Sequence, residues 1–446
     1  MARIAKDSAA AHREEDGKLM LPSRVVSRPT FWLCASLFFL SFAFNVFHVA
    51  PADFFLNFQR DSEALVIGKI AQAREESLFA SRHGLGRYLT DDADAFIPQT
   101  QKNGAPIKGV VGRPFIAYAS EIGLQGFFAA LLDRALFVIP PDNRLTFIRG
   151  ITATLSALSV TAFIAAIYAL TGRIVAIPVA IGLLTAPWFI ALGNNLYYAL
   201  YLWFLPPVAI SVWLLRNPRG SIVQFIALAL AAMLPKFIGA VGFGWAPVFG
   251  VLAITPLCLA YSRIGAREFF RLSGATLAAF LLAGTITFIA LWIIIGDLDY
   301  LTMRFGYRAG TLPCIGYGVD GTCLREPQYQ LGMASPLHVL SLYLYGDTRF
   351  VFGGFWQPLL IGAVGWGLLF LAPIHERFRS AARGLQIAFP VALAGPVCWH
   401  LVMTQHSLIH QHVNFWLWYM PAIPLGFACA TVATAALIEA VHALRS

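Results

Sequence analysis

Apolar residues dominate this sequence in long blocks, separated by shorter polar segments. Crossing the hydrocarbon core of a bilayer takes about 20 mostly apolar residues in one helix, and block after block approaches or reaches that length. The pattern predicts an all-α polytopic membrane protein of about 10–12 transmembrane helices. The clearest segments are 30–50, 150–170, 174–192, 196–215, 221–233, 238–260, 272–295, 350–372, 385–402 and 415–441.

Arginine gathers in alternate connections between these segments. Lys and Arg are retained in cytoplasmic loops, so the alternation assigns a side of the membrane to each connection. It places the polar residues 1–29 in the cytoplasm as a disordered tail, ahead of a transmembrane domain over 30–446. Two large loops, 51–112 and 297–349, then lie outside.

Segment 115–139 does not fit a simple alternation. To keep the orientation, it either crosses twice as a broken helical pair or does not cross at all. A competing model lets it cross once and treats 221–260 as one crossing plus a re-entrant piece around Pro235 and Lys236.

Composition supports the membrane assignment and excludes nucleic acid as a partner. The chain is 58% hydrophobic and 12% charged, values that a water-exposed surface of this size hardly tolerates. Its net charge of +9 suits contact with anionic membrane lipids. No basic stretch is long enough to follow a phosphate backbone.

Two of the six cysteines differ from the rest in their surroundings. Cys314 and Cys323 lie in the polar, glycine-containing segment LPCIGYGVDGTCLRE, whereas the other four lie within apolar segments. A disulfide closing this small loop is predicted, which implies an oxidising compartment such as a bacterial periplasm. A metal site is the alternative, but no second Cys or His pair lies close by in sequence.

Asp61 and Glu63 are the candidate catalytic carboxylates. They lie about ten residues after the first apolar segment, where Glu63 begins an amphipathic stretch over 63–79 that is predicted to be a helix lying on the membrane surface. A carboxylate held there can act as a general base on an acceptor hydroxyl. The alternative is an ordinary helix start, with Asp61 as the cap and Glu63 in the first turn.

A lipid phosphate leaving group needs cationic or hydrogen-bonding side chains nearby. Candidates on the outer side are Arg144, Arg149, Lys236, His406 and His410. Lys236 can instead extend to the interface. The two histidines, at i and i+4, can bind a divalent metal, contact phosphate or sugar, or be structural; a cofactor is therefore not assigned.

Glu121 lies in an apolar segment, where an ionisable side chain is costly and usually faces a cavity. A structural hydrogen bond to a neighbouring helix is the alternative. The aromatic residues after Asn194 and Asn195, and those after the histidines, suit either a membrane interface or a sugar-binding groove: Tyr197, Tyr198, Tyr201 and Trp203, and Trp416, Trp418 and Tyr419.

The chain resembles the GT-C superfamily of lipid-phosphate-dependent glycosyltransferases, which includes protein O-mannosyltransferases and aminoarabinose transferase. Those enzymes carry acidic residues in a first outer loop followed by interfacial helices, the position of Asp61 and Glu63. Further along, the matching positions are Arg149, Arg173, Pro187 and Asn194. The superfamily often has an Asp after that proline helix, where this chain has Asn194 and Asn195.

Two shorter patches resemble uncharacterised bacterial relatives of these enzymes. One is YASEIGLQGFF, which contains Tyr118, Glu121 and Gln125, and the other is QHSLIHQH, which contains His406 and His410.

The resemblance implies an inner-membrane glycosyltransferase that moves a sugar from a polyprenyl-phosphate donor to a glycan, lipid or protein acceptor on the periplasmic side. Asp61 is the expected base, with Glu63 second, and the superfamily's displacement implies inversion at the anomeric carbon. An O-antigen polymerase or ligase, with essential residues such as Arg304 or Arg308, is one alternative. A lipid or solute transporter is the other; it predicts a midplane cavity and internal repeat symmetry.

Overall fold

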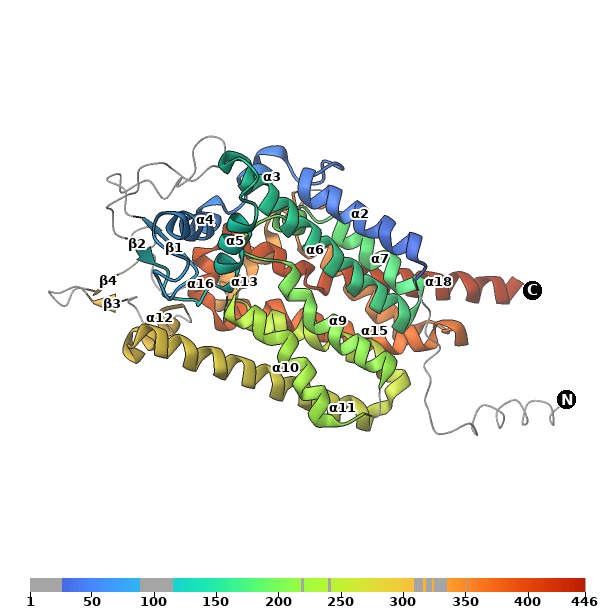
Figure 1. Cartoon of the computed structure of the whole chain (residues 1–446). Helices are drawn as coiled ribbons and strands as arrows, with labels where there is room; N and C mark the ends of the chain where they lie inside the picture. Colours follow the sequence, from blue (N-terminus) through green and yellow to red (C-terminus); the bar gives the residue numbers. More distant parts are fainter. Residues whose placement is uncertain are drawn as a thin grey trace.

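The computed structural model describes residues 26–88, 115–217, 220–239, 242–308, 316–317, 323–324, 335–349 and 351–445. Within these ranges the fold is predominantly helical, as the all-α prediction requires, with two very short antiparallel strand pairs (Figure 1). The predicted disulfide lies outside the described residues, because Cys314 is not among them. The strands are β1 (Gly86–Tyr88) with β2 (Phe115–Ala117), and β3 (Gly316–Tyr317) with β4 (Cys323–Leu324).

A bundle of apolar helices forms the body of the molecule (Figure 1). In the described part of the chain, four helical segments are long and apolar enough to cross a membrane: 141–171, 246–295, 376–402 and 415–445. Five shorter apolar helices accompany them, which together indicate a membrane protein. The bundle comprises α2 (Arg28–Phe44), α6 (Pro141–Thr171), α7 (Arg173–Leu184), α9 (Tyr201–Arg216), α10 (Ile222–Ile238), α11 (Ala246–Ile295), α14 (Trp356–Leu371), α15 (Glu376–Val402) and α18 (Ala422–Arg445).

Helix α11 is two bundle helices joined at a sharp turn. Fifty helical residues in a straight line would extend about 75 Å, far beyond the core of a bilayer. Gly265, at φ 79° and ψ 165°, interrupts the helix, and the chain reverses there (Figure 1). The positive φ is readily adopted by glycine. The two halves correspond to the predicted segments 238–260 and 272–295.

Short helices gather at one end of the bundle, which we call the short-helix end (Figure 1). Among them, α5 has 12 residues and is about 18 Å long, too short to cross a bilayer core of about 30 Å. Segment 115–139 therefore forms β2, a turn and α5 beside α4, with no crossing. The short elements are α3 (Ala52–Asn57), α4 (Arg60–Glu75), α5 (Leu124–Ala135), α8 (Pro187–Leu192), α12 (Leu298–Arg308), α13 (Pro336–Tyr345), α16 (Thr404–Ile409), α17 (Gln411–Asn414) and η1 (Phe415–Tyr419).

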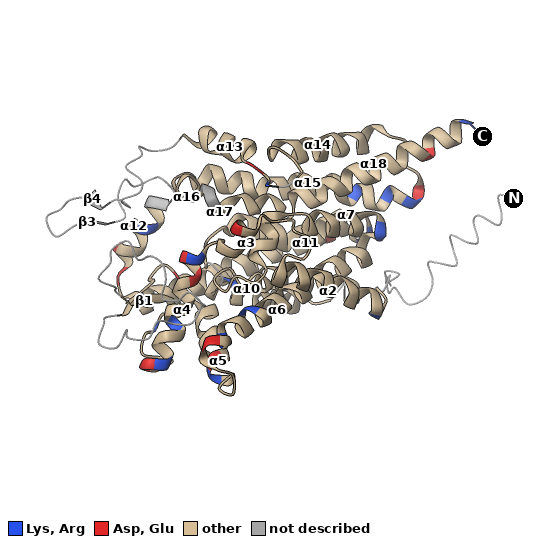
Figure 2. Ribbon diagram, turned by 90° about the horizontal axis from the view of Figure 1, so that it is seen from above, with Lys and Arg blue, Asp and Glu red and all other residues tan. Residues whose placement is uncertain are grey.

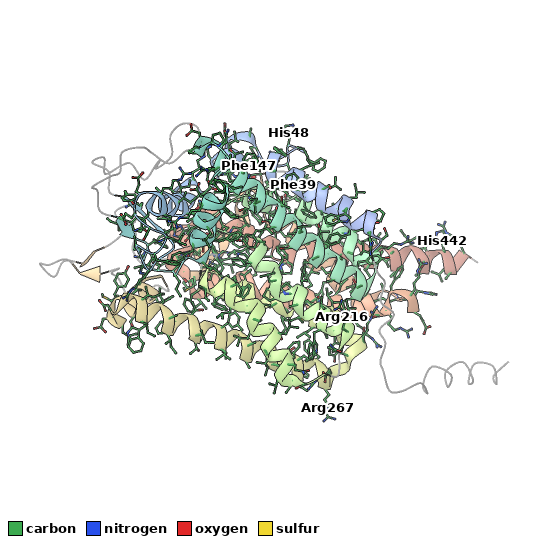
Figure 3. All side chains as sticks on the ribbon, in the orientation of Figure 1. Phe39, His48, Phe147, Arg216, Arg267 and His442 are labelled. Carbon is green, nitrogen blue, oxygen red and sulfur yellow. The ribbon has the colours of Figure 1, made fainter. Side chains whose placement is uncertain are left out.

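The opposite end of the bundle carries mainly arginine, and we call it the arginine-rich end. Helices α2 and α7 begin there at Arg28 and Arg173, α9 ends there at Arg216, and Arg267 lies beside the α11 turn (Figures 2 and 3). Most of the carboxylates in Figure 2 lie at the short-helix end instead. The two ends therefore differ in charge as the sequence pattern predicted.

Small residues bring α7, α14 and α18 close together. A Cβ added at Gly362 of α14 would lie 2.8 Å from the Cα of Gly426 in α18, and one at Gly182 of α7 would lie 3.1 Å from the Cα of Pro424. Such contacts leave no room for a larger residue. Close backbone approach through small residues is the usual basis of helix association in membranes.

Candidate functional site

Asp61 lies in the first turn of α4 at the short-helix end. The helix cap is Gln59, so Asp61 does not cap the helix. Its side chain is exposed and makes no hydrogen bond or ion pair with any residue that the structure describes. A carboxylate in this state can accept a proton.

A buried tyrosine lies next to Asp61. The Tyr198 hydroxyl donates a hydrogen bond to Gln59 Oε1 over 3.2 Å, and the Ser62 hydroxyl donates to the same oxygen over 3.1 Å. The charge of Asp61 acts on the Tyr198 hydroxyl. These contacts fix the start of α4, and with it Asp61, against the segment that joins α8 to α9.

Glu63 lies in the same first turn of α4 but, unlike the exposed Asp61, is buried and already paired. Its carboxylate receives Arg149 Nε over 3.1 Å and pairs with the second guanidinium nitrogen through Oε2. The backbone N–H of Leu196 donates to Oε1 over 3.3 Å. Glu63 and Arg149 therefore join α4 to α6, and both oxygens of the Glu63 carboxylate are already engaged in hydrogen bonds.

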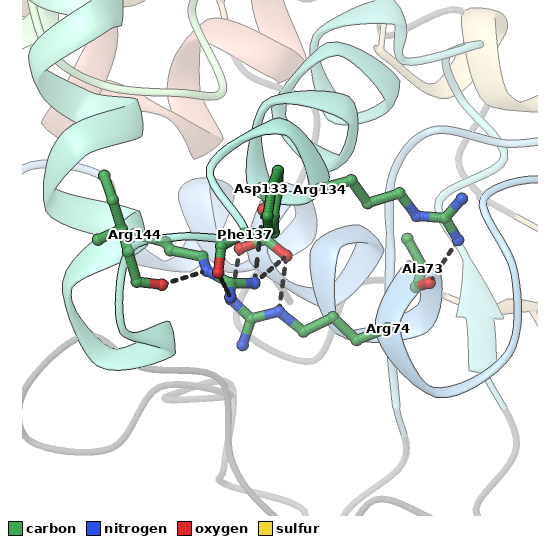
Figure 4. Close-up of polar contacts among 7 residues, drawn as sticks. Ala73, Arg74, Asp133, Arg134, Phe137 and Arg144 are labelled. Carbon is green, nitrogen blue, oxygen red and sulfur yellow. Dashed lines mark hydrogen bonds and ion pairs between the residues drawn. The ribbon is translucent and has the colours of Figure 1, made fainter.

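The Arg144 side chain is hydrogen-bonded to the turn that follows α5 (Figure 4). Its guanidinium donates to the carbonyl oxygens of Ile139 and Phe137 over 2.8 and 3.0 Å. Its Nη1 lies 3.8 Å from the buried carboxylate of Asp133, which also accepts Arg74 Nε over 2.7 Å. The structure thus places Arg144 in a cluster that binds α4, α5 and α6 together.

Asn195 shapes the turn between α8 and α9. Its side-chain oxygen accepts the backbone N–H groups of Tyr197 and Tyr198 over 3.0 and 3.4 Å, and its amide nitrogen donates to the Phe58 carbonyl over 3.1 Å. The neighbouring Asn194 is half-buried. Asn195 therefore positions Tyr198 and the chain that leads into α4.

Glu121 and Lys236 form a second polar centre, also buried. Tyr197 donates its hydroxyl hydrogen to Glu121 Oε1 over 3.2 Å, and the Glu121 charge acts on Lys236. Lys236 Nζ donates to the carbonyl oxygens of Gly242 and Gly244 over 2.7 and 2.9 Å. Because its side chain is fully buried, Lys236 does not extend to the membrane interface.

Aromatic rings connect these polar centres to the histidines. Trp245 stacks on Tyr198 with ring centroids 5.7 Å apart and meets His406 edge-on at 6.2 Å. The rings of His406 and His410 lie 4.4 Å apart, so the predicted pair does come together. Trp245 Nε1 is fixed by Asn414 Oδ1 over 2.9 Å.

A metal site of at least three side chains is not found among the described residues.

Arg349 was not singled out from the sequence. Its guanidinium carbon lies 4.4 Å from the ring centroid of Phe54 and 5.1 Å from that of Trp188. The side chain is exposed, and its guanidinium has no hydrogen-bond partner in the described part of the chain. Phe54 packs on Phe58, and Phe58 on Tyr198, so this cation is two rings away from the tyrosine beside Asp61. The available signal was an arginine at the end of the predicted outer loop 297–349.

Lys69 was also missed. It lies buried on the inner side of α4, where Nζ donates to Gln72 Oε1 and the Ser81 carbonyl over 3.0 and 3.1 Å. Burial lowers the pKa of Lys69 to about 8, although Glu76 opposes the change. Its position is structural, because both acceptors belong to α4 and the chain just after it.

Raising the pH is expected to stabilise the protein through Lys69. The unfolded chain keeps the Lys69 proton up to the ordinary pKa of 10.5, whereas the folded chain releases it near 8. Between these values the unfolded state binds more protons, so the free energy of unfolding rises with pH, by at most about 3 kcal/mol. Thermal unfolding of wild type and Lys69→Met from pH 7.5 to 10 measures it. As the pH rises, the wild type should gain thermal stability relative to the variant. A stability difference that does not change with pH would contradict the lowered pKa of Lys69.

Comparison of this chain with family models, with characterised proteins and with solved structures found no match.

Proposed function

We propose that the protein is a membrane glycosyltransferase of the GT-C type, which moves a sugar from a polyprenyl-phosphate donor to an acceptor at the short-helix end. The observation that carries the proposal is the exposed, unpaired carboxylate of Asp61, held on an end-lying helix beside buried aromatic rings. Catalysis needs a base that the acceptor can reach, and Asp61 meets that need better than Glu63, which is paired with Arg149.

In the proposed reaction, Asp61 takes the proton of an acceptor hydroxyl while that oxygen attacks the anomeric carbon of the donor sugar. The bond between this carbon and the phosphate oxygen breaks, and polyprenyl phosphate leaves with the bonding electron pair. Attack opposite the leaving group inverts the anomeric carbon.

The departing phosphate needs cationic donors that are not already used. Arg149 is paired with Glu63, Arg144 is bonded to backbone carbonyls of the turn after α5, and Lys236 is bonded to Gly242 and Gly244. Arg349 is exposed and its guanidinium is unbonded among the described residues. It is therefore the best placed of these cations to meet the donor phosphate.

The orientation follows from charge. Among the helices that the structure describes, ten crossings are counted when α7 and α8 are taken as one and α11 as two, and an even number would put the start of α2 and the end of α18 on one side. The arginine-rich end then lies in the cytoplasm. The short-helix end, with Asp61, faces the periplasm of a bacterial inner membrane, where lipid-linked donors are used.

Mass analysis of envelope glycans from cells that lack the protein tests this function. One sugar substituent should be missing, and the wild-type gene should restore it. An unchanged set of glycans, glycolipids and glycoproteins would contradict the proposal. Labelling of single cysteines introduced into 51–88 adds a direct check, because their location in the cytoplasm would make the proposed enzyme impossible.

A further inference from the structure

A shallow groove of about 640 Å³ lies on the flank of the bundle, away from Asp61. Helices α7, α14 and α18 form it, and its walls are almost entirely apolar. Ile177 and Ile181 of α7 are 53% and 54% exposed, and Ile361 of α14 is 41% exposed. Large apolar side chains exposed in this way on a membrane helix face hydrocarbon.

Thr431 is the one polar side chain along the apolar part of the groove, and it leaves the groove apolar. The hydroxyl of Thr431, on α18, donates to the carbonyl oxygen of Phe427 over 2.8 Å. Because this hydrogen bond lies within its own helix, the Thr431 hydroxyl needs no partner from a molecule bound in the groove.

A cation closes the groove at the arginine-rich end. Arg173 lines it, is exposed, and makes no ion pair or side-chain hydrogen bond with any described residue. It is also the first residue of the 12-residue helix α7, whose N-terminus carries partial positive charge. The groove therefore combines an apolar channel with positive charge at one end only.

The length of the groove matches one leaflet. From Arg173 to Ile181 the helix rises about 12 Å, and half of a bilayer core is about 15 Å. A single acyl chain fits that span, whereas a long isoprenoid chain would extend well past it.

We propose that this groove binds an anionic phospholipid of the cytoplasmic leaflet, with its phosphate at Arg173 and one acyl chain between α7, α14 and α18. The site is independent of the proposed sugar transfer, because it lies at the opposite end of the bundle. Binding there would hold together three helices whose contacts depend on small residues at Gly362, Gly426 and Gly182.

Native mass spectrometry of the purified full-length protein tests the site by titration with phosphatidylglycerol and phosphatidylcholine. Phosphatidylglycerol should bind more tightly, and Arg173→Gln should weaken its binding about five-fold, since one basic residue contributes about that factor at a lipid surface. Ile177→Trp, which fills the groove from an exposed position, should prevent binding of the acyl chain.

Arg267→Gln is the matched control. Arg267 is exposed at the same end but lies on the α11 turn, outside the groove (Figure 3), so its loss should leave the affinity unchanged. Thermal unfolding of each variant in detergent confirms that the fold is intact. Equal binding of the two phospholipids, equal weakening by both arginine changes, or displacement of phosphatidylglycerol by polyprenyl phosphate would each overturn the proposal.

Discussion

Replacing Asp61 with asparagine is expected to lower the rate of sugar transfer by about 100-fold or more, the range found when a positioned general base is lost. Asparagine keeps the shape of the side chain but cannot take the acceptor proton. Because Asp61 is exposed and unbonded within the described structure, the variant should insert and fold normally. Transfer to acceptor by membranes containing equal amounts of each protein measures the effect.

Asp53→Asn is the control for this change. Asp53 is also exposed, lies in α3 at the same end, and forms no hydrogen bond or ion pair with residues described in the structure. Its loss should leave transfer near the wild-type rate. Full activity of Asp61→Asn would remove Asp61 from the mechanism, and equal losses in both variants would mean that the local negative charge matters and not a specific base.

Replacing Asp133 with asparagine is expected to cost about 3 kcal/mol of stability. The Asp133 side chain is 3% exposed and pairs with Arg74 and Arg144, whose side chains are 24% and 16% exposed (Figure 4). Removing one charge from a buried pair leaves the partner charges without compensation, which costs about 3–5 kcal/mol. The lower value applies because Arg144 keeps its bonds to backbone carbonyls.

A surface pair provides the comparison. Glu376 and Arg379 form an ion pair at side-chain exposures of 81% and 51%, and exposed pairs contribute about 0–1 kcal/mol. Thermal unfolding in detergent should therefore show a clear decrease for Asp133→Asn and little change for Glu376→Gln. Similar small effects in both would show that the Asp133 cluster does not hold α4, α5 and α6 together.

The sequence predicted the apolar segments well, because hydrophobic length and periodicity are local properties. Even the division of α11 agreed with two separate predicted segments, although Gly265 itself was not singled out. The structure of segment 115–139 was harder to predict, because its apolar content resembles that of a membrane span. Asp133 and Arg134 interrupt the apolar residues, and the helix that forms has only 12 residues.

The partners of the charged side chains could not be predicted in the same way. Glu63 pairs with Arg149, 86 positions away, and Arg74 with Asp133, 59 positions away. Such pairs depend on how α4 packs against α5 and α6, and a single sequence carries no record of that packing. Once it is known, Glu63, Arg144 and Arg149 become structural contacts, whereas Asp61 keeps the exposure that a base requires.

Helix α4 is attached to its neighbours at both ends, which limits how it could move during the proposed reaction. Glu63 ties its first turn to α6, and Arg74 ties its last turn to α5, so the helix cannot swing outward like a lid. In the proposed transfer Asp61 would then keep a fixed position, and donor and acceptor would have to be brought to it. Any gating motion would have to come from other chain segments around the site.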